Sequence, residues 1–552
     1  MHSIDQRPRA ATPSPARTES SPATGYPRPR ARRHPLRDDL ALLGGDLGKR
    51  LATTSYPLFL HSAGAGAGLL APLSAMAAAR AADHTIRHVP AYRAFLARAG
   101  VSPGAHSHDE GSAAWLRGLP VTDKASYIQP FSIEDRCVDG RIPTAGTQID
   151  ESAGSSGVPY NWVRGRAEMR ELHGSLSLFS RYLFGPNLVC INAFSMGAWA
   201  TGVNAGEALR RSSIVKSTGP DLHKVLATLR ALGPRYRYLI TGYPPFLKRV
   251  VDTGLATGLD WRTYNVAALV GGEGMTEGLR TYLERYLRVV FSSYGATDLD
   301  VGMAGEMPIS VWIRRQAADR PALRTALFGA DPRLPMLFQY NPLDYYVETN
   351  ADDELIFTVN RLSLLSPRIR YNIHDTGGVI PFARMLAVLR DFGLRPPARL
   401  HPPGQPVFHL PFLYLFGRSD NTVSYMGANI YPEDIEHALL ATADDAVRLG
   451  AYCLELVALD SAATSGARAA EQRPCVHLEV LRGPAEDPAL AERLRERILA
   501  HLLQCNLDFR AAVSEDSSAA ELRVRLHAPG AGPFAGNLGR IKERHILRGS
   551  GA

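Results

Sequence analysis

The chain has 552 residues, too many for one ordinary hydrophobic core, so we expect at least two domains. Its apolar fraction of 45% and charged fraction of 21% are those of a soluble globular protein. The formal net charge of +8 points to a polyanion partner, but residues 1–37 alone carry eight Arg and only two acidic residues. The rest of the chain is therefore close to neutral, and the basic excess belongs to this N-terminal segment.

Residues 1–37 form a basic tail rich in Pro, Ser and Arg. Such a composition cannot bury enough apolar surface to fold, so we predict that the tail is disordered. An arm that binds nucleic acid or a membrane is the alternative. Because aromatic residues are nearly absent from the tail, a solvated extension is favoured over that arm.

The five cysteines are odd in number, widely spaced and never arranged as CxxC, which argues against a disulfide framework and against a zinc site. A reduced, cytoplasmic location fits best, and no apolar signal core follows the first residues. The stretch Tyr56 to Ala79 is long enough for a membrane span, but His61, Pro72 and many Ala and Gly residues make it weakly hydrophobic. We predict a packed or surface helix there and no membrane span.

Short apolar runs alternate with amphipathic stretches between residues 38 and 416. Strands are predicted at 187–194, 236–243 and 266–271, and helices at 219–232 and 276–287. Alternation of this kind is typical of a layered α/β fold. We expect one large N-terminal α/β domain over residues 38–416.

The composition changes after Gly417. A helix is predicted from Pro432, where two acidic residues suit a helix start, followed by a strand at 475–481 and a second helix at 488–504. We place a domain boundary near Gly417 and expect a small, mobile C-terminal α+β domain over residues 417–552.

The first stretch that suggests chemistry is ESAGSSGVPYNW, from Glu151 to Trp162. Small residues let successive backbone N–H groups converge on an anion, and serine hydroxyls add donors. The stretch lacks the Lys-Ser/Thr ending of a Walker P-loop, and a plain surface turn is the alternative. The candidate phosphate-binding residues are Ser152, Gly154, Ser155, Ser156 and Gly157.

Two further stretches follow predicted strands. ALVGGEG places Gly272 and Glu273 after one strand, and VVFSSYGATDLD ends the next with Ser293 to Asp298. The second stretch offers an aromatic face, a Gly for close approach, a hydroxyl and a carboxylate suited to Mg²⁺. The candidates are Ser293, Tyr294, Gly295 and Thr297 for a nucleotide and Asp298 for a metal, and a buried Tyr beside an ordinary turn is the alternative.

The remaining candidates lie further along the chain. Asp375 follows a strand-like run and precedes two glycines, so we expect it at a strand end, where a carboxylate can accept hydrogen bonds from ribose hydroxyls; a turn-capping Asp is the alternative. Arg418, Arg540 and Lys542 are cations that could neutralise a phosphate-bearing transition state if the small domain folded over the large one.

Taken in order, these motifs resemble the adenylate-forming superfamily of acyl-CoA synthetases, adenylation domains and luciferases, and most closely its phenylacetate-CoA ligase-like branch. The resemblance begins at IRHVPAYRAFLARAGV and LPVTDKASYI and extends almost to the C-terminus. It implies an enzyme that joins a carboxylic acid to AMP from ATP, with Mg²⁺, and then passes the acyl group to coenzyme A.

The resemblance also implies roles for the candidates. The loop from Ser152 to Gly157 would clamp the ATP phosphates, Gly272, Glu273 and Tyr294 would border the adenine, and Thr297 would meet the α-phosphate. Asp298 would help to hold Mg²⁺, Asp375 would take the ribose hydroxyls, and Arg418 would reach the nucleotide from the hinge. Candidates for the acyl pocket are Phe194, Trp199 and Tyr243, and for the acceptor loop Tyr425, Gly427 and Asn429.

Several positions depart from the family's pattern. Asp298 stands where the family usually has Glu, Arg540 stands where it has the catalytic Lys, and Lys542 comes two residues later. The acceptor loop lacks basic residues for the phosphates of coenzyme A. Two alternatives therefore stay open: an adenylating enzyme whose acceptor is an amine, a carrier-protein thiol or another nucleophile, and a catalytically silent nucleotide-binding relative. The acid is not identified, and the oligomeric state is open, with a homodimer as one option.

Overall fold

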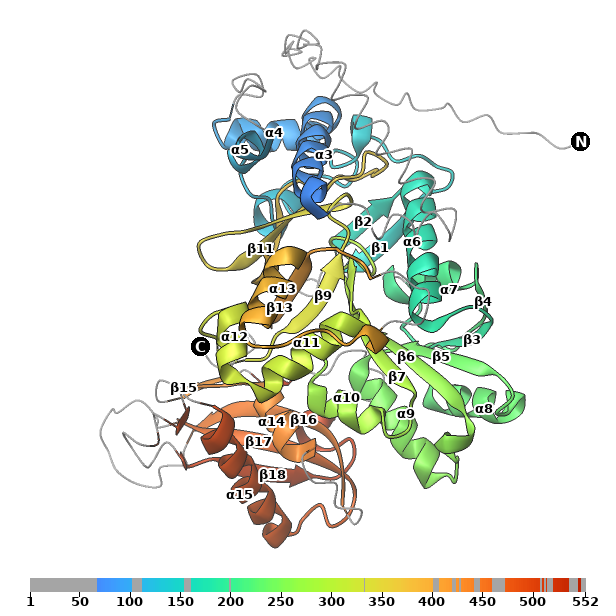
Figure 1. Cartoon of the computed structure of the whole chain (residues 1–552), viewed down its shortest axis with the longest axis vertical. Coiled ribbons are helices and arrows are strands. Elements are labelled where there is room, and N and C mark those ends of the chain that lie inside the picture. The colour runs from blue at the N-terminus through green and yellow to red at the C-terminus, as the bar shows by residue number, and fades with distance from the viewer. Residues whose placement is uncertain are drawn as a thin grey trace, which may run out of the picture.

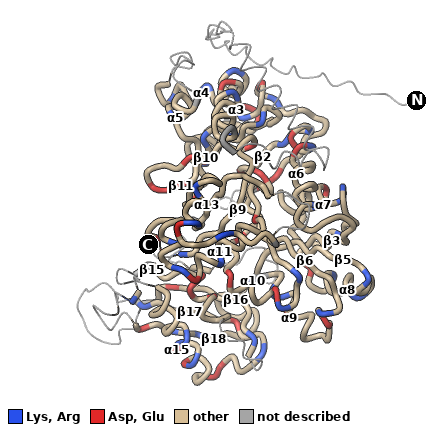
Figure 2. Tube along the Cα trace, viewed as in Figure 1, with Lys and Arg blue, Asp and Glu red and all other residues tan. Residues whose placement is uncertain are grey.

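The computed structural model describes residues 67–101, 112–152, 160–197, 200–331, 333–400, 407–418, 423–425, 428–440, 447–458, 472–506, 509–510, 513, 520–535 and 545–547 (Figure 1). An α/β body contains an 11-stranded sheet, and a smaller C-terminal region has its own four-stranded sheet. The predicted fold class, α/β with a small C-terminal α+β part, is confirmed. Lys and Arg are interspersed with Asp and Glu over the described residues (Figure 2).

The first helices pack against the body. Among them α3 includes Pro72 and covers part of the stretch that had suggested a membrane span. No helix in the described part of the chain is long and apolar enough to span a membrane. The elements here are α3 (Ala67–His88), α4 (Pro90–Arg98), α5 (Ser112–Arg117), the short helical turns η2 (Lys124–Ile128) and η3 (Val138–Gly140), and the antiparallel hairpin β1 (Gln148–Ser152) and β2 (Tyr160–Arg164).

One half of the large sheet is parallel, in the order β4-β3-β5-β6-β7. The strands β3, β5, β6 and β7 are short apolar runs that are mostly buried, as parallel strands covered by helices require, whereas the edge strand β4 is largely exposed. The elements are α6 (Arg166–Phe184), β3 (Leu188–Asn192), α7 (Ala200–Leu209), β4 (Ser213–Ser217), α8 (Leu222–Leu232), β5 (Arg237–Gly242), α9 (Pro244–Ala256), η4 (Trp261–Thr263), β6 (Asn265–Gly271), α10 (Glu277–Leu283) and β7 (Val289–Tyr294).

The strands and helices predicted for this half are confirmed. The helix expected to reach residue 287 instead ends at Leu283. The C-cap N–H of Glu284 donates to the carbonyl of Arg280, and turns lead from there into β7. The parallel arrangement brings the ends of β6 and β7, where two of the candidate motifs begin, to the same edge of the sheet.

The other half of the large sheet is antiparallel, in the order β10-β11-β12-β13-β9-β8. The segment between β12 and β13 carries α13, and its apolar side chains share a core with α11, α12, β9 and β13. The elements are β8 (Ala304–Gly305), α11 (Pro308–Asp319), α12 (Pro321–Phe328), β9 (Met336–Tyr340), β10 (Tyr345–Thr349), β11 (Glu354–Val359), β12 (Tyr371–Ile380), α13 (Phe382–Asp391), η5 (Ala398–Leu400) and β13 (Phe412–Arg418).

From Val423 onward the buried apolar residues form a cluster of their own. The strand order in this C-terminal region is β18-β17-β16-β19, and α14 packs against α15. The predicted helices from Pro432 and Pro488 and the strand at 475–481 are confirmed. The elements are β14 (Val423–Tyr425), β15 (Ala428–Ile430), α14 (Pro432–Leu440), β16 (Arg448–Ala458), β17 (Gln472–Arg482), α15 (Pro488–Cys505), β18 (Arg523–His527), η7 (Gly532–Phe534) and β19 (Ile546–Leu547).

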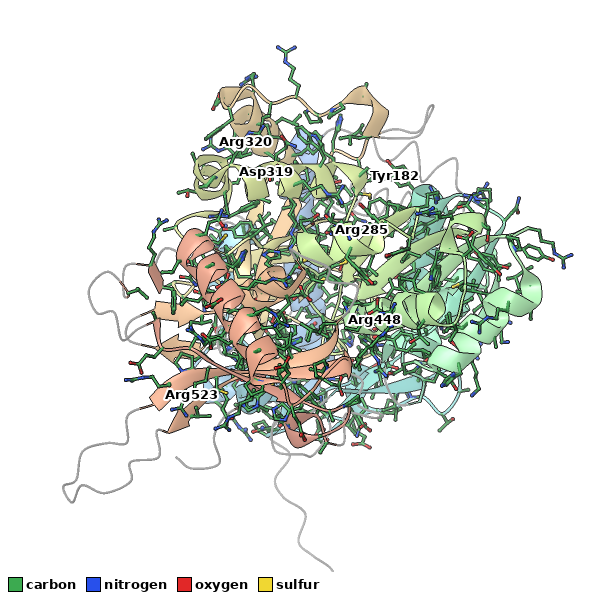
Figure 3. The ribbon with its side chains drawn as sticks, turned by 90° about the horizontal axis from the view of Figure 1, so that it is seen from below. Tyr182, Arg285, Asp319, Arg320, Arg448 and Arg523 are labelled. Carbon is green, nitrogen blue, oxygen red and sulfur yellow. The ribbon has the colours of Figure 1, made fainter. Side chains whose placement is uncertain are left out.

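The C-terminal region docks on α9 and α10 of the body. The Thr276 hydroxyl donates to Glu436, and Arg448 Nη1 donates to the carbonyl of Asp252 over 2.7 Å. Lys248 Nζ donates to the carbonyl of Leu449 over 3.3 Å. Figure 3 shows Arg448 at this junction, between the C-terminal region and the body.

Candidate functional site

The ends of β6 and β7 lie side by side. Gly271 pairs in register with Ser293, and a Cβ on Gly271 would lie only 2.8 Å from Ser293 Oγ. Gly272 has φ +84°, and a Cβ there would lie 2.6 Å from Tyr243 Cε1. Glycine is thus required at Gly272 by both backbone conformation and space. The two candidate motifs meet at this edge.

Tyr294, the last residue of β7, donates a hydrogen bond from its hydroxyl to Asp375 Oδ2 over 2.7 Å. Its ring is stacked with that of Phe338, with centroids 5.9 Å apart, and tilted against that of Phe357 at 6.3 Å. Since β8, β9 and β13 separate β7 from β12 in the sheet order, the sheet must curve to bring these two side chains together. The structure therefore brings together two candidate nucleotide-binding residues from segments that are distant in the sequence.

The expectation that Asp375 ends a strand is wrong. Asp375 lies in the middle of β12, paired in register with Arg418 of β13. The following glycines suggested a turn, but they are needed for close approach of β13, since a Cβ on Gly377 would lie 2.1 Å from the Tyr414 carbonyl oxygen. The ladder is irregular here, and the preceding His374 has φ +64°. His374 itself forms a hydrogen bond with Glu354 over 2.9 Å.

Asp298 is buried, and its carboxylate faces a cation. Lys124 Nζ lies 3.1 Å from Asp298 Oδ2, and the Tyr371 hydroxyl donates to the same oxygen over 3.2 Å. Burial is the main cause that raises the pKa of Tyr371, and the Asp298 charge adds to it, so this phenol stays a hydrogen-bond donor. Arg368 Nε donates to the Asp298 carbonyl over 3.1 Å and fixes the backbone.

Lys124 also connects Asp298 to the Ser/Gly loop. Its ammonium lies 5.4 Å from the centre of the Tyr160 ring, and Tyr160 pairs in register with Ser152 across the β1–β2 hairpin that flanks residues 153–159. Asp123 caps the turn η2 that Lys124 begins, with Asp123 Oδ1 accepting from the Ser126 N–H over 2.7 Å. Sequence reasoning missed Lys124, although LPVTDKASYI contains the capping pattern that signals a positioned turn.

A buried guanidinium holds the loop after β7. Arg164 Nη2 donates to the carbonyl of Thr297 over 2.8 Å, and Arg164 lies within 3.1 Å of carboxylate oxygens of Asp150, Glu168 and Asp300. Burial opposes the charge on Asp300, but the neighbouring guanidinium groups outweigh it and lower its pKa. A network of this kind, with each buried charge paired, fixes Thr297 and Asp298 on a rigid support.

The acyl-pocket candidates Phe194 and Tyr243 lie beside Gly271 and Gly272. Their rings meet edge to face with centroids 5.5 Å apart and are nearly fully buried, in a small cluster with Ala205. Burial raises the pKa of Tyr243, so its hydroxyl is neutral at pH 7. The pair forms an apolar wall next to the candidate nucleotide residues.

Several predicted residues lie outside what the structure describes. They are Gly154, Ser155, Ser156, Gly157, Trp199, Gly427, Arg540 and Lys542. For Ser152, Arg418, Tyr425 and Asn429 the backbone is described and the side chain is not. The roles expected of these residues stay predictions.

The residues around Asp298 define what metal could bind there. The described part of the chain contains no cluster of three or more His, Cys, Asp or Glu side chains that could hold a metal ion. Mg²⁺ usually binds through one or two carboxylates together with substrate phosphates. A single carboxylate at Asp298 fits Mg²⁺ that arrives with a nucleotide and does not fit a metal held by protein ligands alone.

This fold is shared by a solved structure. A structure of 2-hydroxyisobutyryl-CoA ligase in the postadenylation state, in complex with 2-HIB-AMP, has a TM-score of 0.60 and 15% sequence identity, and covers 86% of this chain and 88% of the ligase. A structure of the same ligase in complex with 2-HIB-AMP and CoA in the thioesterification state has a TM-score of 0.49 and 15% sequence identity, and the match covers 88% of this chain and 90% of the ligase. The structure of amide bond synthetase McbA from Marinactinospora thermotolerans has a TM-score of 0.38 and 15% sequence identity, and the match covers 72% of this chain and 73% of McbA.

No protein-family model matches this sequence, and no curated protein matches it significantly. The structural comparison shows that the chain has the fold seen in 2-hydroxyisobutyryl-CoA ligase over most of its length. The resemblance to adenylate-forming enzymes that the motifs indicated is confirmed at the level of the fold.

Proposed function

We propose that this protein is an AMP-forming ligase that activates a carboxylic acid as its acyl adenylate and then transfers the acyl group to coenzyme A. The observation that carries the proposal is that residues from separate motifs meet at the end of β7. Tyr294 contacts Asp375 there, and Lys124 links Asp298 to the base of the Ser/Gly loop.

The roles of the side chains follow from their chemistry. A carboxylate can accept several hydrogen bonds, and the Asp375 carboxylate would accept those from the ribose hydroxyls. The Tyr294 ring would border the adenine with Gly272 and Glu273. Residues 152–157 would clamp the phosphates, and Thr297 would meet the α-phosphate.

In the first half-reaction a carboxylate oxygen of the acid attacks the α-phosphorus of ATP, and the bond to pyrophosphate breaks. Mg²⁺ bound with ATP supplies positive charge to the phosphates, and Asp298 would hold it. Lys124 would add a second positive charge on the Ser/Gly-loop side. Because Arg164 fixes the loop that carries Thr297 and Asp298, the protein's contribution is positioning and charge stabilisation.

In the second half-reaction the thiolate sulfur of coenzyme A attacks the acyl carbonyl carbon, and AMP leaves. We propose Tyr425, Gly427 and Asn429 as the acceptor loop, with residues 38–416 and 417–552 as the two functional units. The loop has no basic side chain for the phosphates of coenzyme A. This feature favours, as a second candidate, an acceptor other than coenzyme A, such as an amine or a carrier-protein thiol.

The test is product analysis by mass spectrometry. Purified full-length protein is incubated with ATP, Mg²⁺ and a mixed panel of aryl, aliphatic and amino acids, with and without coenzyme A. AMP together with an acyl-CoA supports the ligase and identifies the acid. AMP without a thioester contradicts coenzyme A as the acceptor and supports the second candidate. Absence of AMP and pyrophosphate with every acid contradicts the adenylation itself.

A further inference from the structure

Arg333 lies in the connection between α12 and β9, and its guanidinium is held in a fixed orientation. Arg333 Nη2 lies 2.7 Å from Asp331 Oδ2, and Nε lies 3.1 Å from Asp331 Oδ1. Nη1 donates to the carbonyl of Phe416 over 3.3 Å. Burial works against the positive charge, but the bond to Asp331 outweighs it, and the pKa of Arg333 is raised. The cation is therefore permanent.

Two aromatic rings lie against this cation. The Arg333 guanidinium carbon is 5.0 Å from the centre of the Phe416 ring and 4.8 Å from the centre of the Tyr431 ring. Both distances are within the range of attractive cation–π contacts, which strengthen where water is excluded. Tyr431 is buried, and the Arg333 side chain is 15% exposed.

The two rings belong to different parts of the molecule. Phe416 lies on β13 of the large sheet, whereas Tyr431 immediately precedes α14 of the C-terminal region. Residues 419–422, which lie between Phe416 and Tyr431 in the chain, are the covalent connection between the two parts. One cation thus bridges the last aromatic residue before the connection and the first residue after β15.

The contacts on the α9 and α10 side include hydrogen bonds, from Thr276 to Glu436 and from Arg448 to the Asp252 carbonyl, and these require defined distances and angles. A planar guanidinium on a ring face tolerates sliding and rotation much better. Arg333 can therefore keep contact with Phe416 while Tyr431 moves over it or leaves it.

We propose that Arg333, clamped between Phe416 and Tyr431, is a positioning residue that sets the orientation of the C-terminal region relative to the body and thereby the balance between the two half-reactions. The part that concerns half-reactions rests on the proposed function. Arg333 does not take part in bond making. Its effect comes through the placement of residues 423–547, which include the acceptor loop.

The test compares four variants of the full-length protein. Arg333→Ala removes the cation, and Arg333→Lys keeps the charge but loses the flat guanidinium and the paired bonds to Asp331. Tyr431→Leu removes the ring, and Tyr431→Phe is the matched control that keeps it. Two activities are measured: pyrophosphate exchange into ATP with the acid that gives AMP, and acyl transfer from preformed acyl adenylate to the acceptor that the product analysis identifies. Thermal unfolding is recorded for each variant.

Orientation is measured separately, by pulsed electron spin resonance between spin labels at Lys224→Cys on α8 and Glu496→Cys on α15. The background carries Cys505→Ser, since Cys505 is exposed and the cysteines at 137, 190, 453 and 475 are buried. This measurement requires no substrate. It therefore separates failure of the clamp from failure of the proposed function.

We expect Arg333→Ala and Tyr431→Leu to slow one half-reaction about tenfold more than the other, which is the size of effect expected when the cation loses its contacts with the rings. We also expect both variants to broaden or shift the distribution of distances between the two spin labels. Tyr431→Phe should match the wild type, and Arg333→Lys should fall between. Equal slowing of both half-reactions with an unchanged distance distribution overturns the proposal and leaves Arg333 a purely structural residue. If the wild type forms no acyl adenylate, an unchanged distance in Arg333→Ala and Tyr431→Leu alone overturns the clamp.

Discussion

Tyr294 and Asp375 are joined by a 2.7 Å hydrogen bond although their strands, β7 and β12, are not neighbours in the sheet. The Tyr294 hydroxyl thereby orients the Asp375 carboxylate. The sequence alone did not predict this contact, because the two residues lie on separate segments. Because the Tyr294 ring is also stacked with Phe338, its hydroxyl has little freedom to leave this position. This hydrogen bond would pre-orient the Asp375 carboxylate for the ribose hydroxyls that we propose it binds.

Substitution of these two residues should separate orientation from binding. We expect Tyr294→Phe to raise KM for ATP about tenfold, since a hydrogen bond to a charged group contributes about 1.5–3 kcal/mol and the ring contacts remain. Asp375→Ala should lower kcat/KM for AMP formation by roughly 100-fold or more. Steady-state pyrophosphate release at varied ATP measures both. An equal loss in both variants would mean that Asp375 acts only through Tyr294.

The Lys124–Asp298 pair predicts that Lys124 acts in adenylation. Lys124→Ala should lower kcat for pyrophosphate release by roughly 100-fold, the usual scale for removal of a positioned charge from a phosphoryl-transfer site. Lys124→Arg retains the charge and should recover part of the activity. Lys224→Ala, which removes an exposed lysine of α8, is the matched control and should behave as wild type. Full activity of Lys124→Ala would show that the pair is only structural.

The sequence predicted much of the parallel half of the sheet, because β3, β5 and β6 are continuous apolar runs bounded by turn residues. It did not predict Lys124, because its partners Asp298 and Tyr160 come from segments that meet only through the tertiary fold. The segment that carries Lys124 is held in the fold by contacts such as the hydrogen bond from the Thr122 N–H to the Arg370 carbonyl, beside β12. Asp375 was placed at a strand end because glycines usually mark turns, whereas Gly377 here makes room for β13.

Gly272 should tolerate no side chain. Gly272→Ala would force a non-glycine residue to φ +84° and push its Cβ against the Tyr243 ring, at a cost of about 1–3 kcal/mol. We expect a lower Tm and a raised KM for ATP and for the acid. Gly274→Ala is the control, since a Cβ there meets no atom within 4 Å. If both variants behave alike, the Gly272 turn does not shape the site.

The C-terminal cations Lys542 and Arg540 lie outside the described residues, and their roles stay predictions. If Lys542 is the cation inserted during adenylation, Lys542→Ala should reduce pyrophosphate release far more than acyl transfer from preformed acyl adenylate. The reason is that bond making and bond breaking at the α-phosphorus occur only in the first half-reaction. Arg540→Ala is the comparison. If Arg540→Ala, and not Lys542→Ala, reduces pyrophosphate release far more than acyl transfer, then Arg540 is the cation that acts in adenylation.

We expect His437 to make the docking of α14 sensitive to acid. Its ring lies against α10, where a Cβ on Gly278 would be 3.0 Å from His437 Cδ2. Burial is the main cause that lowers the pKa of His437 to about 4, with help from His501 on α15 and Arg314 on α11, while Glu277 on α10 opposes the shift. Because the folded pKa lies below the ordinary 6.5, the unfolded chain takes up the proton first.

The stability that neutral His437 contributes is therefore complete above pH 6.5 and is lost as the pH falls from 6.5 towards 4. Over that range the loss approaches about 3 kcal/mol, from 1.36 kcal/mol per pKa unit. His437→Gln, which cannot be protonated, should lose less stability than wild type over the same interval. Urea unfolding of both proteins at pH 7, 6, 5 and 4 measures the difference. Parallel curves would show that His437 does not become charged on unfolding, and would assign the acid response of this interface to other groups.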